Sequence, residues 1–396
     1  MRDVSPRLHL DPASPVFLDD PHPVFDRLRA EAAVVSDPIG WSTIDYATSA
    51  EAFANRALTP GIDPLLESRG IEPLWGEVGR TLTDSEGDDH RNLRRVVGPW
   101  FTPPRVEALR HHVRTLCEEL VVAADPHEPF DVMASYADVV PARLFCWMVG
   151  APESLAPRLA SLSKTLLSVF TATDEMVEPV RAAKVEMAEL TRELIAARTQ
   201  TPGDDVVSMM LGSVASGDLD TETVFYLVEE LLSASVDNTA NTTGLALWTL
   251  LHHRDTYRRI GSDPDLAAPA AEECGRVEPA IRHTIKYALS DTSVGGVEMP
   301  AGSFVTIRIA AAHRDPAIYD DPHRFDPDRA WPKPQLAFGL GRHYCLGAAL
   351  GRMEIAEMVR ALAVGRPDAE IGDHVDMTKN AAGLVHRLDL IPGAHR

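Results

Sequence analysis

The sequence predicts a mainly α-helical protein with small β-sheets. Two observations support this fold class: long segments have apolar residues at helical spacing, and strand patterns are few, short and late in the chain. The chain has 396 residues, of which 45% are hydrophobic and 24% charged, an ordinary globular composition. We see no internal repeat and no linker, so we expect one domain over 1–396.

Thirty prolines divide the chain into segments. They cluster in predicted extended or loop segments at 1–24, 59–74, 99–104 and 316–334. Between them, apolar residues at helical spacing predict helices over 105–124 and 178–199. Residues 221–253 contain no proline and one glycine. They predict one long helix of roughly 45 Å at about 1.5 Å per residue, enough to cross a domain.

The strand patterns come late. Residues 295–313 predict a turn and then an alternating strand pair around Pro300–Gly302, and residues 384–392 predict another strand. Between these two segments, the sequence predicts a helix that begins directly after Cys345. The sheets are therefore expected to be small and marginal.

The charge balance is acidic, with 38 Lys and Arg against 59 Asp and Glu, a net charge of −21. Nucleic-acid binding needs a basic face, and anionic membranes repel acidic proteins, so neither partner is expected. No apolar run is long enough to span a membrane, and the N-terminus lacks the layout of a signal peptide. We expect a cytoplasmic protein.

Four cysteines lie far apart, which does not favour structural zinc or a disulfide framework. Three stand in apolar or helical surroundings typical of buried, inert thiols: Cys117, Cys146 and Cys274. Cys345 differs, because Gly339, Gly341 and Gly347 surround it and a predicted helix follows. A helix N-terminus stabilises a thiolate, and haem iron is one metal that such a thiolate binds. The alternative is a buried cysteine in a glycine-rich turn.

The segment Phe338–Gly347, FGLGRHYCLG, resembles the haem-binding loop of the cytochrome P450 family, F-G-x-G-x-H-x-C-x-G. Every fixed position matches. The resemblance implies that Cys345 is the axial metal ligand of haem b (iron protoporphyrin IX), that Phe338 packs near the sulfur, and that His343 reaches a haem propionate. The resemblance also implies that Gly339, Gly341 and Gly347 belong to the cofactor-binding residues. It extends over nearly the whole chain and is closest to soluble bacterial members.

The family fold so implied is a triangular helical domain with a long central helix over the haem. Glu273-Cys274-Gly275-Arg276 resembles the family's E-x-x-R motif, with Arg329 as its partner. A Glu between two Arg makes a charge-assisted network, which we expect to be structural rather than catalytic. A surface salt bridge is the alternative.

Three further cations are implied to hold the haem. His90 and Arg94 resemble an H-x-x-x-R pair and lie one helical turn apart. Lys286 stands where the family usually has Arg. Lysine supplies the charge without the bidentate geometry, so this anchor departs from the family pattern.

The central helix of the family carries a pattern like A-G-x-D-T-T, and the matching stretch here is Ala234–Thr239. The acid is Asp237, but Asn238 replaces the usual threonine and Thr239 follows. Oxygen activation needs protons, which carboxyl and hydroxyl groups relay more readily than an amide. We predict Asp237, Asn238 and Thr239 as the catalytic residues. We favour Asn238 positioning water or substrate in an ordinary oxygenation; the alternative is a non-hydroxylating reaction such as oxidative coupling.

The same helix carries a cluster of polar residues: Ser233, Ser235, Asn238, Asn241 and Thr242. Such side chains can bond back to their own helix or cap a kink. We favour a functional role, because a polar cluster within an apolar helix needs a water or ligand beside it.

The resemblance also places substrate contacts, at Leu166, Phe170, Ala234, Ile281 and Leu384. Helical core is an equally good interpretation for 163–170. The predicted substrate is a small, largely hydrophobic organic molecule. With no flavin or iron–sulfur module in the sequence, electrons are expected from a separate ferredoxin and ferredoxin reductase. Candidate docking cations are Arg91, Arg94, Arg95, Arg342 and Arg352.

The predicted function is a haem-thiolate monooxygenase that uses O2 and two electrons. Oxidative coupling or another non-hydroxylating oxidation is the first alternative. A catalytically silent helper protein of the same fold is the second, and the complete cysteine loop argues against it.

Overall fold

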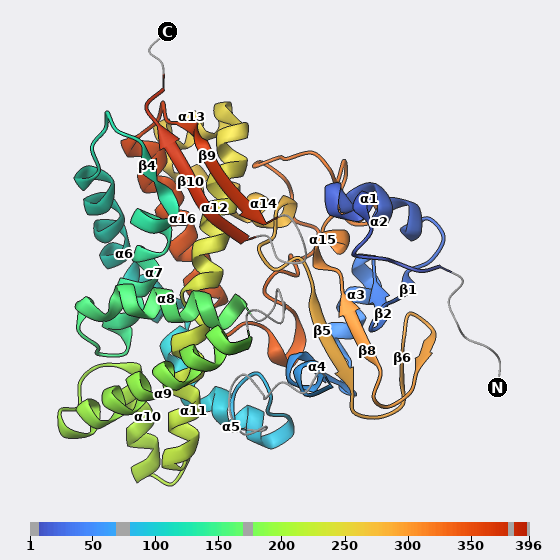
Figure 1. Ribbon diagram of the computed structural model, residues 1–396, viewed down its shortest axis with the longest axis horizontal. Helices are drawn as coiled ribbons and strands as arrows, with labels where there is room; N and C mark the ends of the chain where they lie inside the picture. Colours follow the sequence, from blue (N-terminus) through green and yellow to red (C-terminus); the bar gives the residue numbers. More distant parts are fainter. Residues whose placement is uncertain (1–7, 69–79, 169–176, 379–383, 394–396) are drawn as a thin grey trace. The chain divides into compact units, whose positions relative to one another are not determined.

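The computed structural model describes residues 8–68, 80–168, 177–378 and 384–393, drawn as ribbon in Figure 1. They divide into two units. The first unit comprises Met1–Glu72, Glu273–Cys345 and Thr378–Leu384. The second comprises Pro73–Glu272, Leu346–Met377 and Val385–Arg396.

The first unit combines short helices with two small sheets. Its helices are α1 (Pro15–Asp19), α2 (Pro21–Arg29), α3 (Tyr46–Ala54), α4 (Ile62–Ser68) and α15 (Ile309–Ala312). Its strands are β1 (Val34–Asp37), β2 (Gly40–Thr43), β3 (Leu58–Pro60), β5 (Thr284–Ala288), β6 (Thr292–Val294), β7 (Val297–Met299) and β8 (Phe304–Ile307). The larger sheet has the order β1-β2-β8-β5-β3, with β2 and β8 parallel and the other pairs antiparallel.

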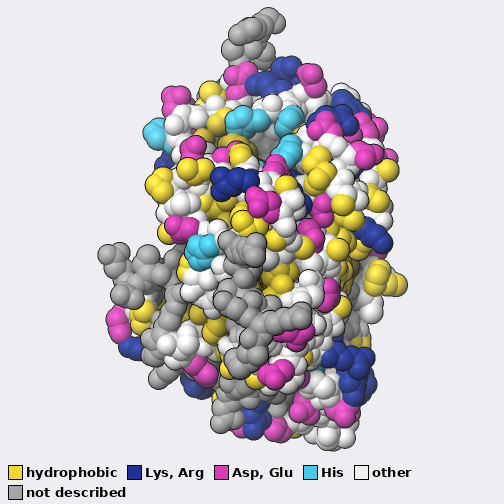
Figure 2. Space-filling model, turned by 90° about the vertical axis from the view of Figure 1, so that its right-hand side faces the viewer, with side chains coloured by type: hydrophobic (Ala, Val, Ile, Leu, Met, Phe, Trp, Pro, Cys, Tyr) yellow, Lys and Arg dark blue, Asp and Glu magenta, His cyan; other side chains and the backbone are white. Residues whose placement is uncertain are grey.

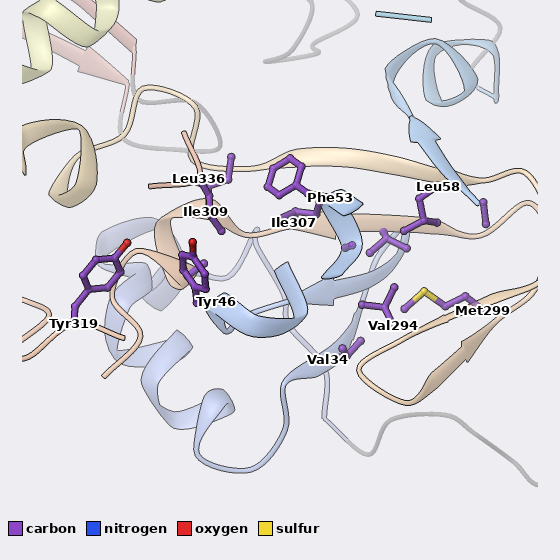
Figure 3. Close-up of a cluster of buried hydrophobic side chains, with 14 residues drawn as sticks. Val34, Tyr46, Phe53, Leu58, Val294, Met299, Ile307, Ile309, Tyr319 and Leu336 are labelled. Carbon is purple, nitrogen blue, oxygen red and sulfur yellow. The ribbon is translucent and has the colours of Figure 1, made fainter. Parts of the chain in front are cut away.

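A buried hydrophobic cluster joins this sheet to α3 and to the segment that precedes the cysteine loop. Figure 3 shows Phe53 of α3 and Leu336 near Ile307 of β8. Leu336 is completely buried in this cluster. The chain leading into the Cys345 loop is therefore anchored in the core of the first unit.

The second unit is mainly helical. Its α-helices are α5 (Gly87–Val97), α6 (Pro103–Ala123), α7 (Val139–Met148), α8 (Ala156–Leu167), α9 (Val177–Gln200), α10 (Val206–Ala215), α11 (Thr221–Ala234), α12 (Asp237–His252), α13 (Arg254–Ser262) and α16 (Ala348–Gly365). A three-stranded sheet has the order β4 (Phe130–Asp131), β10 (Leu384–Ile391) and β9 (Glu370–Thr378). Helix α14 (Ala267–Val277) crosses from this unit into the first.

Within the second unit, α16 packs against α6, α12 and α13. The helix is buried over much of its length, with Met353, Met358 and Leu362 in its core face. These contacts fix the helix that follows Cys345 in the sequence.

The long helix predicted over 221–253 is two helices in the structure, because the helix is interrupted between Ala234 and Asp237. The Ser235 hydroxyl donates to the Leu231 carbonyl at 2.5 Å. Serine hydroxyls that bond back in this way bend helices. The helical prediction is correct for both segments and wrong for their continuity.

The predicted strand pair around Pro300–Gly302 is also wrong as a pair. Both strands exist, but β7 pairs with β6, whereas β8 joins the five-stranded sheet between β2 and β5. Strand β8 pairs with β2, which is distant in the sequence, and local alternation cannot reveal such a partner. The strand predicted over 384–392 is confirmed as β10.

The N-terminal segment 1–24 contains helix where we predicted extended chain. Pro15 and Pro21 occupy the first positions of α1 and α2, where proline is well tolerated because its missing N–H would have no partner. The Asp20 side chain caps α2 by accepting from the His22 N–H at 3.0 Å. Proline there marked helix starts rather than loop.

The predicted fold class is confirmed: the chain is mainly helical with small sheets. The helices predicted over 105–124, 178–199 and after Cys345 appear as α6, α9 and α16. No helix in the described ranges combines the length and apolar character needed to cross a bilayer. The assignment of 1–396 to one domain stays a prediction.

Candidate functional site

The loop that carries Cys345 closes on itself through backbone hydrogen bonds. The Cys345 N–H donates to the Phe338 carbonyl at 2.9 Å, and the Gly339 N–H donates to the Leu336 carbonyl at 2.8 Å. A short 3-10 turn, Gly341–His343, lies within the loop. The thiol of Cys345 is exposed, whereas those of the other three cysteines are buried. The loop therefore presents an accessible sulfur from a fixed backbone.

Two glycines of this loop adopt backbone conformations that disfavour side chains. The φ angles are 69° at Gly339 and 72° at Gly341. A Cβ would lie 3.4 Å from the Phe53 ring at Gly339, and 3.1 Å from the Phe53 carbonyl oxygen at Gly341. Both positions therefore favour glycine for the backbone angle, and Gly341 also for the close approach of α3. Gly347, with φ −82°, caps the start of α16 in an ordinary conformation.

Arg342 ties the loop to the end of α3. Its guanidinium donates to the carbonyls of Asn55 at 3.2 Å, Arg56 at 3.4 Å and Leu58 at 2.9 Å. We predicted Arg342 as a docking cation, but these contacts give it a structural task. The carbonyls belong to a segment distant in the sequence, so local pattern could not reveal them.

Lys286 of β5 shares a neighbour with the cysteine loop. Its side chain is buried, and its ammonium lies 5.8 Å from the ring centre of Phe53. Phe53 also borders Gly339 and Gly341. Two other loop residues, Phe338 and His343, are half-buried.

These features of the first unit fit a haem group. Haem iron accepts a thiolate ligand, which an exposed cysteine sulfur can supply. A buried ammonium such as that of Lys286 is stabilised by an anionic neighbour, and a haem propionate is an anion. Two groups of the matching chemistry are thus present, an accessible sulfur and a buried cation.

The predicted Glu273 network is confirmed. Arg276 donates twice to the Glu273 carboxylate, at 2.8 and 2.7 Å, and Arg329 donates to it at 3.1 Å. The side chains are 0% exposed for Arg276, 1% for Glu273 and 6% for Arg329. Arg276 also donates to backbone carbonyls at Pro322 and Arg324. The network is buried and fixes the irregular segment that leads towards the cysteine loop, so the surface alternative is wrong.

In the second unit, the central acid Asp237 is the first residue of α12 and is buried. Burial raises the pKa of its carboxyl to about 7. The Lys164 ammonium opposes this rise, the Asp138 carboxyl adds to it, and a hydrogen bond from Asn241 opposes it. Lys164 and Asp138 form an ion pair at 3.4 Å. Sequence analysis missed both, since they lie on other elements.

All five members of the predicted polar cluster bond back to carbonyls one helical turn earlier. The bonds run from Ser233, Ser235, Asn238, Asn241 and Thr242 to Glu229, Leu231, Ala234, Asp237 and Asn238. The Asn238 bond is long, at 3.4 Å. Among the described residues, none forms a hydrogen bond with the Thr239 hydroxyl. The back-bonding interpretation is therefore confirmed as the local geometry of this helix.

Asn241 makes a second bond that connects α12 to β10. Its Nδ2 donates to the Asp237 carbonyl at 3.0 Å, and its Oδ1 accepts from the Val385 N–H at 2.8 Å. The side chain is buried. Asn241 thus fixes the start of β10 against the helix that begins with Asp237.

The predicted haem cations His90 and Arg94 both lie on α5, in the second unit. His90 is buried and Arg94 is half-buried. Their spacing places them on one face of the helix, as the sequence predicted.

The predicted substrate residues occupy different elements. Leu166 of α8 is buried, as a core residue would be. Ala234 is exposed although Leu231, Leu232 and Ser233 before it are buried. Ile281 is 38% exposed, Leu384 opens β10 and is half-buried, and Phe170 lies outside the described residues.

Comparison with known proteins identifies the family. The model of the family described as cytochrome P450 matches residues 74–362. The chain is 30% identical over 386 residues to luteothin monooxygenase of Streptomyces thioluteus, covering 94% of this chain and 95% of that protein. It is 29% identical over 389 residues to vitamin D(3) 25-hydroxylase of Pseudonocardia autotrophica, covering 96% of this chain and 94% of that protein.

Solved structures agree. The crystal structure of CalO2 superposes with a TM-score of 0.88 at 25% identity, covering 98% of this chain and all of that one. P450BioI, solved in complex with an acyl carrier protein ligated to hexadec-9Z-enoic acid, gives 0.87 at 25% identity, covering 95% and 99%. Sequence motif, fold and relatives therefore converge: the chain belongs to the cytochrome P450 family and is a monooxygenase of that family.

Proposed function

We propose that this enzyme inserts one oxygen atom from O2 into a small, largely hydrophobic organic substrate. It would use haem b and two electrons from a separate ferredoxin and ferredoxin reductase. The observation that carries the proposal is the exposed thiol of Cys345, held in a closed glycine loop. When bound, the haem supplies the iron at which O2 is activated.

In the first unit, Cys345 would supply the thiolate ligand of the haem iron. The sequence continues into α16, and the free N–H groups of a helix start favour the thiolate over the thiol. Phe338 would pack near the sulfur, and Gly339 and Gly341 maintain the loop shape. Lys286 and His343 would hold propionates.

In the second unit, His90 and Arg94 would provide further positive charge for propionates. Gly347, at the start of α16, completes the proposed cofactor-binding set. Histidine and arginine one turn apart suit this role because carboxylates accept charge-assisted hydrogen bonds from both.

Protons would pass through Asp237 with Thr239 and Asn238. A carboxyl whose pKa is about 7 can both release and regain a proton at neutral pH. The Thr239 hydroxyl can donate and accept. The Asn238 amide is only weakly engaged by its 3.4 Å bond to Ala234, so it can orient water or substrate.

The substrate contacts are proposed at Leu166, Ala234, Ile281 and Leu384, together with Phe170. The relatives' names support small organic molecules: one is a luteothin monooxygenase, another a vitamin D(3) 25-hydroxylase. Both names denote oxidation of an organic compound. Ala234 is exposed although Leu227–Ser233 before it are buried, which supports a ligand beside the end of α11.

Product mass tests this function. Hydrophobic compounds would first be screened for a shift of the haem absorption band. Those that bind would then be turned over with ferredoxin, its reductase and O2. We expect a product heavier by one oxygen atom, with that atom labelled when 18O-labelled O2 is used. A product that instead lacks two hydrogens would replace the oxygenation proposal with coupling. A purified protein that holds no haem would instead favour the silent-helper alternative.

For the ferredoxin, we propose a docking region that includes Arg91 and Arg95 on α5. On the face drawn in Figure 2, acidic and basic side chains are interspersed, and the chain as a whole has a net charge of −21. An acidic partner therefore needs local cations. The Arg91 side chain is 71% exposed and that of Arg95 is 59% exposed. Arg352 is half-buried and bonded twice to Glu272, at 2.9 and 3.2 Å, which makes it a weaker candidate.

Arg91→Glu is expected to slow ferredoxin-driven turnover by about 3- to 10-fold at low salt, because the reversal weakens electrostatic steering. The difference should shrink as salt rises. Arg181→Glu is the matched control, since Arg91 and Arg181 each pair with an acid three residues earlier on an exposed helix face. Equal slowing in both variants, or slowing independent of salt, would remove α5 from the docking region. The readout is initial rate against ferredoxin concentration.

A further inference from the structure

His313 follows α15 and is completely buried, with both ring nitrogens bonded to backbone. Its Nδ1 lies 3.2 Å from the Arg276 carbonyl oxygen. Its Nε2 lies 2.7 Å from the Leu336 backbone nitrogen. The ring therefore bridges the arginine of the Glu273 network and the segment that enters the cysteine loop.

The partners determine which nitrogen carries the proton. A backbone N–H can only donate, so Nε2 must accept from Leu336. A carbonyl can only accept, so Nδ1 must carry the hydrogen and donate to Arg276. Burial, with the nearby Arg276 guanidinium, lowers the pKa of the ring to about 3. His313 is thus neutral and in one tautomer.

One side of the bridge is rigid. Arg276 is held by Glu273, and its Nη1 donates back to the His313 carbonyl at 2.9 Å. The two residues therefore exchange hydrogen bonds: the side chain of each bonds the backbone of the other. In the first unit, this fixes the imidazole against a buried ion-pair network.

The other side reaches Cys345 in two backbone steps. The Leu336 carbonyl accepts from Gly339, and the Phe338 carbonyl accepts from Cys345. Just before Leu336, the Pro334 carbonyl accepts from the Tyr46 hydroxyl at 2.7 Å, whereas the buried Gln335 Oε1 has no hydrogen-bond partner among the described residues. The His313 bond is thus a principal polar anchor at the entrance of the loop.

We propose that His313 is a positioning residue for the Cys345 loop, acting through the Leu336 N–H. The role rests on the proposed function, because it assumes that Cys345 is the haem ligand.

Two conservative variants separate the two bonds. Asparagine places an amide near the position of Nδ1, so His313→Asn keeps the donor to Arg276 and loses the acceptor for Leu336. Glutamine places an amide oxygen near the position of Nε2, so His313→Gln keeps the acceptor and loses the donor. Both side chains are amides of similar chemistry, so each variant serves as the control for the other.

The first readout is the absorption spectrum of the haem-loaded protein, reduced and exposed to carbon monoxide. We expect His313→Asn to lose much of the red-shifted band of thiolate ligation, and His313→Gln to keep it. The second readout is hydrogen exchange of the Cys345 backbone N–H, which donates to the Phe338 carbonyl in the closed loop, measured in haem-free protein. It should be up to about tenfold faster in His313→Asn, as expected when one hydrogen bond no longer opposes loop opening. Thermal unfolding of both variants shows how much of any difference comes from a general loss of stability.

If two equally stable variants kept the same fraction of the wild-type thiolate band, the positioning role would be overturned. If His313→Asn does not fold, His313→Gln decides: a band at the wild-type fraction supports the role, and its loss overturns it. A wild-type protein without the thiolate band would instead refute the proposed function, whatever the variants do.

Discussion

Replacing Cys345 by alanine is expected to abolish the red-shifted carbon monoxide band of the reduced protein. The band depends on a thiolate bound to the haem iron, and the other three cysteines of the chain are buried. Burial also raises the pKa of the Cys146 thiol to about 11 and that of Cys117 to about 12, so neither forms a thiolate readily. Turnover driven by ferredoxin should disappear with the band.

Cys146→Ala is the control, because it removes a thiol without touching the loop. Its spectrum should match the wild type. A Cys345→Ala protein that keeps the wild-type band would show that another residue binds the iron. Haem content, measured in parallel, distinguishes an altered ligand from lost cofactor.

Replacing Asp237 by asparagine is expected to lower turnover by about 100-fold at neutral pH, the lower end of general acid catalysis. The amide cannot release a proton to the route that we propose through Thr239 and Asn238. In the wild type, turnover should fall as pH rises above about 7, since the carboxyl then loses its proton. The asparagine variant should lack that decline. The measurement is turnover against pH, with ferredoxin saturating.

Stability provides the control for this variant. Burial raises the pKa of Asp237 from 3.8 to about 7, so folding takes up a proton between these pH values. Stability from this group is therefore greatest at low pH and declines as pH rises towards 7. Asp237→Asn should raise Tm at pH 8, and this gain should shrink as pH falls towards 4. Wild-type turnover in a stabilised variant would remove Asp237 from the proton route.

Structural features that depend on residues close together in the sequence were predictable. The helices α6, α9 and α16 follow from apolar spacing, which depends on local geometry alone. The loop around Cys345 was recognisable because all of its parts lie within ten residues of sequence, from Phe338 to Gly347. The Glu273–Arg276 pair was predictable for the same reason, since a spacing of three places both on one helix face.

Predictions failed where local signals had two outcomes. Proline at 15 and 21 suits either a loop or the first turn of a helix, and the structure has helices. The polar cluster of the central segment suits either a functional role or back-bonding; its five members bond back to carbonyls one turn earlier, and their functional role stays a prediction. Alternation at 295–313 identified strands but not their partners.

The sequence by itself determined the family, the mainly helical class, and the cysteine, acid and cations proposed to serve the haem. Only the tertiary structure decided which of these have supporting partners. Asn241 meets Val385 from 144 positions away, and Arg342 meets Leu58 from 284 positions away. His313 is held between Arg276 and Leu336, and Lys286 lies against Phe53. Hydrogen bonds and burial depend on distance in space, and a linear pattern does not contain that distance until the chain has folded.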